Sequence, residues 1–76
     1  MEFEKLQQII ADTLSVDPED VTHESKFRDD FGADSLDLYS IIAAIEDELD
    51  IEIPIEEAEK IVTVDDALVA IRGAIE

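Results

Sequence analysis

The sequence predicts an all-α protein, a small bundle of three main helices plus one short helix. Two observations predict this class. Apolar residues recur with a helical period in three segments, and only 2 Gly and 2 Pro interrupt the chain. A length of 76 residues leaves room for one small domain, so we expect a single domain over residues 1–76. No strand is expected.

The first helix is predicted from Glu2 to about Leu14. One face of this segment carries an apolar stripe, which consists of Phe3, Leu6, Ile9, Ile10 and Leu14. A single turn is predicted next, because Asp17 before Pro18 is typical of a capping residue followed by a proline at the first helical position. The polar stretch 22–33 is long for so small a domain, and we expect Phe27 and Phe31 to anchor it.

The second helix is predicted to start at Asp34 or Ser35 and to end near Leu49. Asp34 is a suitable cap and is followed three residues later by Asp37, which is typical of a helix start. This helix carries two apolar stripes. One comprises Leu38, Ile41, Ile42, Ile45 and Leu49, and the other comprises Leu36, Tyr39 and Ala43. A helix in a small bundle needs only one core-facing stripe, so the second is a candidate contact surface.

Two further helices complete the prediction. A brief helix is expected over Ile55 to Ile61, with a poor cap because Ile55 cannot accept a hydrogen bond. The last helix has a clearer start, with Thr63 as cap and Asp66 three residues later. Its apolar face comprises Val64, Ala67, Leu68, Ile71 and Ile75.

Composition excludes several classes of function. The chain has 22 Asp and Glu against 5 Lys and Arg, a formal net charge of −17. Nucleic acid and anionic membranes are poor ligands for such a protein, and a protein partner with a basic patch is favoured. There is no Cys, so any thiol must arrive on a cofactor. The N-terminal residues lack the features of a secretion signal and no run is long enough to span a bilayer, so we expect a cytoplasmic protein.

Ser35 is the residue best placed for chemistry. It follows Gly32 at the opening of a helix, where its hydroxyl is expected to be exposed. An anion attached to this oxygen would lie near the free N–H groups of the first turn, which favours a phosphate ester. The same position also suits a simple helix cap, and the residues alone leave both readings open.

The segment from Phe27 to Asp37 resembles the modification motif of acyl carrier proteins, with Gly32-Ala33-Asp34-Ser35-Leu36-Asp37 at its centre. The similarity extends over nearly the whole chain. It implies that Ser35 carries 4'-phosphopantetheine, which a phosphopantetheinyl transferase takes from coenzyme A with Mg²⁺. The thiol of this arm would hold acyl groups as thioesters, so the resemblance implies a carrier for fatty acid biosynthesis rather than an enzyme.

The resemblance also implies how the carrier meets its partners. The residues expected to dock on basic patches of the transferase and the fatty acid synthesis enzymes are Asp34, Leu36, Asp37, Tyr39, Ala43, Glu46 and Asp47. The acyl chain is expected to be sheltered inside a monomeric bundle. The candidate pocket residues are Ile42, Ile45, Ile61 and Leu68.

Other functions account for parts of the same sequence. A carrier for a specialised polyketide, peptidyl or D-alanyl pathway would use the same arm. An EF-hand is excluded, because placing Gly32 at position 6 puts Phe27 first and Leu38 last, where acidic ligands are required. No specific metal site is expected. A hydrolase would need His23 to approach Ser35, and an acidic inhibitor would leave the motif around Ser35 unexplained.

Overall fold

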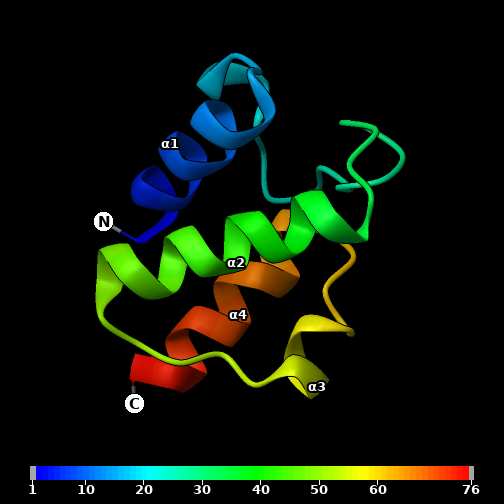
Figure 1. Cartoon of the computed structure of the whole chain (residues 1–76). Coiled ribbons are helices and arrows are strands. Elements are labelled where there is room, and N and C mark those ends of the chain that lie inside the picture. Colours follow the sequence, from blue (N-terminus) through cyan, green and yellow to red (C-terminus); the bar gives the residue numbers. More distant parts are fainter. Residues whose placement is uncertain (1, 76) are drawn as a thin grey trace.

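The computed structural model describes residues 2–75, which form a body of 28 × 24 × 19 Å. Its elements, in chain order, are α1 (Glu2–Leu14), the 3-10 turn η1 (Pro18–Asp20), α2 (Ser35–Leu49), α3 (Ile55–Ala58) and α4 (Val64–Ile75). No strand occurs within residues 2–75. In the view of Figure 1, α1 lies above α2, α4 lies below it and α3 lies at the lower edge. Helices α1 and α4 also contact each other directly. The predicted all-α class is confirmed.

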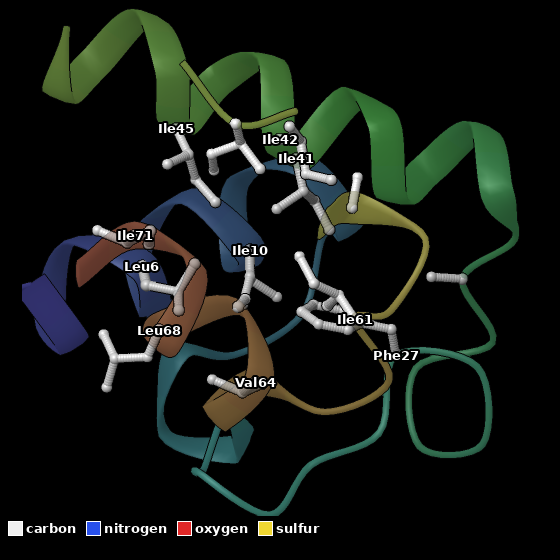
Figure 2. Close-up of a cluster of buried hydrophobic side chains, with 14 of the residues drawn as sticks. Leu6, Ile10, Phe27, Ile41, Ile42, Ile45, Ile61, Val64, Leu68 and Ile71 are labelled. Carbon is white, nitrogen blue, oxygen red and sulfur yellow. The ribbon is translucent and has the colours of Figure 1, made fainter. Parts of the chain in front are cut away.

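One hydrophobic core joins the three long helices. Figure 2 shows side chains from α1, α2 and α4 converging on a common interior. The largest fully buried members are Leu6, Ile10, Val21, Ile41, Ile45, Val64, Leu68 and Ile71. The apolar stripe predicted for α4 is buried except at its end, because Ile75 in the last turn is exposed.

Local hydrogen bonds fix the helix starts as predicted. Asp17 caps η1 by accepting a hydrogen bond from the N–H of Glu19. At α4, Thr63 Oγ1 accepts from the N–H of Asp66 at 3.2 Å, and Asp66 Oδ2 accepts from the N–H of Thr63 at 3.1 Å. This reciprocal pair is a capping box, which satisfies backbone donors that the helix itself leaves free.

Side-chain packing and backbone hydrogen bonds both hold the long connection between α1 and α2 in place. Phe27 is buried and packs edge-on against the half-buried Phe31, so both predicted anchors contact the core. The loop backbone also pairs with the segment before α4. The N–H of Phe27 donates to the carbonyl of Val62 at 3.1 Å, and that of Val64 donates to Ser25 at 2.9 Å. These bonds hold the loop against the entry to α4.

Helix α3 is shorter than predicted. It ends at Ala58 rather than at Ile61, because the N–H groups of Lys60 and Ile61 donate to carbonyls three residues back, which tightens the chain into a turn. The expected weakness of its start is confirmed, because no side chain caps α3. The predicted cap residue is wrong, since Pro54 occupies the cap position and Ile55 is the first helical residue.

Candidate functional site

Ser35 is the first residue of α2, and it is not the cap. Asp34 occupies the cap position. Its Oδ1 accepts from the N–H of Asp37 at 2.9 Å, and Asp37 Oδ2 accepts from the N–H of Asp34 at 3.3 Å. The reading of Ser35 as a simple helix cap is therefore wrong, because the aspartate before it takes that role. The hydroxyl of Ser35 remains exposed and available for chemistry.

A tight turn precedes Ser35 and brings Arg28 next to it. Gly32 has a φ of +66°, in the left-handed region that glycine adopts at little cost. The N–H of Gly32 donates to the carbonyl of Arg28 at 3.0 Å, and that of Ala33 donates to Phe27 at 2.9 Å. As a result Arg28 Nη2 donates a hydrogen bond of 3.2 Å to Ser35 Oγ.

A cleft of about 420 Å³ opens beside Ser35, between the start of α2, the long loop and the end of α3. Its charged residues include Lys26, Arg28, Asp29 and Asp34. Its apolar residues include Phe27, Ala33, Leu38, Ala58, Ile61 and Val62, and Tyr39 also lines it. Figure 2 shows Phe27 and Ile61 lying close together. The cleft thus joins an exposed hydroxyl to an apolar interior.

The cleft shares one residue with the pocket that the sequence predicted for the acyl chain. Of the four candidates, only Ile61 lines it. Ile42, Ile45 and Leu68 are buried core residues. The sequence did not single out Ala33, which lies in the motif, Leu38, which follows it, or Ala58 at the end of α3. In the sequence, the only feature that indicates these residues as cleft residues is a small or apolar side chain.

The exposed face of α2 carries the candidate contact residues. Leu36 and Tyr39 have large, mostly apolar side chains, yet Leu36 is 75% exposed and Tyr39 is 43% exposed. Ala43 and Asp47 are also exposed, so the second stripe of α2 does face away from the core. Ile41, Ile42 and Ile45 occupy the opposite, buried face.

Two acidic residues of this set have structural contacts as well. Asp37 is half-buried and belongs to the capping box. Glu46 is also half-buried, and its Oε2 accepts a hydrogen bond of 2.7 Å from the N–H of Ile53. This contact ties the loop after α2 back to the helix, so Glu46 supports the fold in addition to adding charge.

The residues required by the competing functions lie elsewhere. The ring of His23 stacks on Phe3 with centroids 4.1 Å apart, and its Nδ1 lies 3.3 Å from Asp65 Oδ1. His23 therefore contacts α1 and α4, while the hydroxyl of Ser35 contacts Arg28.

Within residues 2–75, no group of three or more His, Cys, Asp and Glu side chains is arranged to hold a metal ion. None of the described helices is long and apolar enough to cross a bilayer.

Comparison with known proteins identifies the family. The profile of the family described as "Phosphopantetheine attachment site" matches residues 4–70. The chain belongs to the acyl carrier protein family. It is 53% identical over 68 residues to the acyl carrier protein of Clostridium acetobutylicum, covering 90% of this chain and 88% of that one. A protein of the same name from Wolinella succinogenes is 48% identical over 66 residues, covering 87% of each chain.

Membership in the acyl carrier protein family establishes a carrier role and a covalent 4'-phosphopantetheine group. The residues around Ser35 suit such a group. An exposed hydroxyl can form the ester, a guanidinium lies within hydrogen-bonding distance of that oxygen, and an apolar cleft opens beside it. When bound, the group supplies a terminal thiol that holds acyl chains as thioesters.

Proposed function

We propose that Ser35 is the attachment site and that this carrier serves fatty acid biosynthesis. One observation carries the assignment of Ser35. Its hydroxyl is exposed at the first turn of α2, is not used in capping, and borders the cleft. Of the other serines, Ser25 is buried and hydrogen-bonds to Thr22. Ser15, after α1, and Ser40, on α2, are exposed but do not line that cleft.

Attachment of phosphopantetheine to Ser35 requires one substitution reaction at phosphorus. Its Oγ attacks the phosphorus of coenzyme A that bears the pantetheine. The new Oγ–P bond forms while the bond from that phosphorus to the bridging oxygen breaks. Adenosine 3',5'-bisphosphate leaves, and the hydroxyl proton passes to a base of the transferase. The chain presents the nucleophile and is not itself an enzyme.

The exposed face of α2 is the surface we assign to partner enzymes. Asp34 and Asp47 offer exposed carboxylates, and Leu36 and Tyr39 offer apolar area between them. Acidic charge speeds the encounter with a basic patch, whereas a few apolar contacts fix the orientation of the complex. We expect Asp37, Ala43 and Glu46 to contribute to the same surface.

The cleft beside Ser35 is the place we assign to the acyl chain. Phe27, Ala58 and Ile61 are buried residues that line it. Burial of each methylene group in such surroundings stabilises the protein by about 0.8 kcal/mol.

The proposed carrier is a single monomeric domain in the cytoplasm, without nucleic acid or specific metal sites.

Intact-mass measurement tests the assignment of Ser35. The full chain is incubated with coenzyme A, Mg²⁺ and a broad-specificity phosphopantetheinyl transferase. Wild type is expected to gain one phosphopantetheine, and Ser35→Ala none. Ser40→Ala is the matched control, because it removes an exposed hydroxyl from the same helix. Modification of Ser35→Ala, or an unmodified wild type, would contradict the proposal.

A further inference from the structure

Cations are scarce in this chain, and two of them gather at the cleft. There are 5 Lys and Arg among 76 residues, and Lys26 and Arg28 both line the cleft beside Ser35. The surroundings are otherwise acidic, since residues 28–37 contain Asp29, Asp30, Asp34 and Asp37. A cation held at this point reduces the local negative charge.

The side chain of Arg28 makes a hydrogen bond to the hydroxyl oxygen of Ser35. Its Nη2 donates to Ser35 Oγ at 3.2 Å, and no salt bridge of Arg28 to an acidic side chain is found within residues 2–75. The turn at Gly32 fixes this geometry, because the carbonyl of Arg28 accepts from the N–H of Gly32. Arg28 also lines a second, more open hollow of about 440 Å³, together with residues 32–36. Arg28 and Ser35 therefore both border the cleft and this second hollow.

We infer that Arg28 pairs with the phosphodiester formed on Ser35 and orients the arm at the mouth of the cleft. This inference rests on the proposed attachment at Ser35. Esterification replaces the hydroxyl proton with a phosphorus atom that carries anionic oxygens. These oxygens lie two bonds from Oγ, the atom to which Arg28 already donates. Arg28 acts as a positioning residue, because the covalent bond itself is made by Ser35.

The type of side chain matters for this role. Guanidinium offers five donors in a planar fork, which matches two phosphate oxygens at once, whereas an ammonium group acts as a point charge. Pairing also offsets the repulsion that a phosphodiester would feel from Asp34 and Asp37 at the same helix start. Without Arg28, adding the anion to this acidic segment should destabilise the fold.

The test compares the effect of modification on stability in three proteins: wild type, Arg28→Gln and Arg72→Gln. Arg72 is the matched control, because it is an exposed arginine toward the end of α4, with its Nε 4.0 Å from Glu2. Figure 1 shows that end of α4 on the opposite side of the molecule from the start of α2. Melting temperatures are measured for the unmodified and modified full chains, with complete conversion checked by intact mass.

For each protein, the Tm of the unmodified form is subtracted from that of the modified form. This difference should be about 2–4 °C lower in Arg28→Gln than in wild type, as expected for the loss of an exposed ion pair in a small domain. It should be unaltered in Arg72→Gln. A second measurement uses wild type alone. The side-chain NMR signals of Arg28 should shift and exchange more slowly with water on modification, and those of Arg72 should not.

Two results would overturn the inference, and they can be told apart. If wild type is modified but Arg28→Gln and Arg72→Gln respond equally, or if the Arg28 signals do not move, the pairing is contradicted while the attachment at Ser35 stands. If intact mass shows no modification of wild type, or modification that persists in Ser35→Ala, the proposed attachment fails and the inference fails with it.

Discussion

Aspartate side chains complete the backbone hydrogen bonding at several helix starts of this carrier. Asp17 and Asp34 each accept from a free N–H of the first turn, and Asp66 accepts from the N–H groups of Thr63 and Val62 just before α4. At Asp66, the backbone N–H of Thr63, followed by that of Val62, lowers the pKa of the carboxyl group, while partial burial opposes this effect. A charged group held in this way makes local stability depend on pH.

The sign of that dependence follows from the lowered pKa. The folded state favours the carboxylate of Asp66 more than the unfolded state does. Its contribution is therefore complete above the ordinary pKa of an aspartate, near 3.9. It is lost as the pH falls through the lower pKa of the folded state.

Replacing Asp66 by alanine should lower the free energy of unfolding by about 0.5–2 kcal/mol at neutral pH, as expected for the loss of a cap. The difference from wild type should shrink as the pH falls below about 4, because wild type then loses the same carboxylate. Urea unfolding at several pH values measures this. Asp29→Ala, which removes an equal charge from an exposed loop position, should show little difference at any pH.

At the scale of elements, Gln7 joins α1 to the turn that follows it. Its Nε2 donates to the carbonyl of Val21 at 2.8 Å and to that of Pro18 at 3.3 Å. Val21 is buried in the core, so the contact helps to hold the beginning of the long loop in place. Gln8 is the neighbouring residue, and its exposed amide bonds only to Asp12, one turn further along α1.

Gln7→Ala is expected to destabilise the fold by about 1–2 kcal/mol, because two partly buried carbonyls lose their side-chain donor. In a domain of this size, each kcal/mol corresponds to a fall in Tm of about 4–8 °C. Gln8→Ala serves as control and should change stability by less than about 0.5 kcal/mol. Equal effects of the two substitutions in thermal unfolding would show that the link to the turn contributes nothing.

At the scale of the whole molecule, the cleft connects the proposed attachment point to the core. Ala33, Ala58 and Ile61 are buried, and they come from the motif, from α3 and from the turn after it. Helix α3 has only four residues and no side-chain cap, so this wall of the cleft is held by little local structure. This part of the protein can therefore move to admit an acyl chain at a small cost in free energy.

Loading the arm with an octanoyl chain should therefore stabilise the protein more than loading it with an acetyl group. Six additional methylene groups give a gross gain of up to about 5 kcal/mol if all are buried. Even partial burial should raise Tm by more than about 5 °C relative to the acetyl form. Thermal unfolding of the two forms measures this. Identical melting temperatures would mean that the chain stays in solvent.

Much of the fold could be predicted because its signals are local. The stripe of Leu6 and Ile10 and that of Ile41 and Ile45 identify the buried faces of α1 and α2 through the 3.6-residue period. The pairs Asp34 with Asp37 and Thr63 with Asp66 identify the helix starts, because a capping box spans only four residues. The end of α3 was predicted three residues too late, because the choice between a helical and a 3-10 turn carries a weak sequence signal.

The sequence by itself determined the all-α class, the starts of α2 and α4, and the exposure of a hydroxyl at Ser35. Those features depend on residues within a few positions of one another. Only the tertiary structure decided which side chains line the cleft and that Arg28 bonds to Ser35. The cleft is built by two segments, residues 26–39 and 58–62, that are far apart in the sequence, and the reach of Arg28 depends on the turn at Gly32. The positions of such groups follow from packing, which no short stretch of sequence encodes.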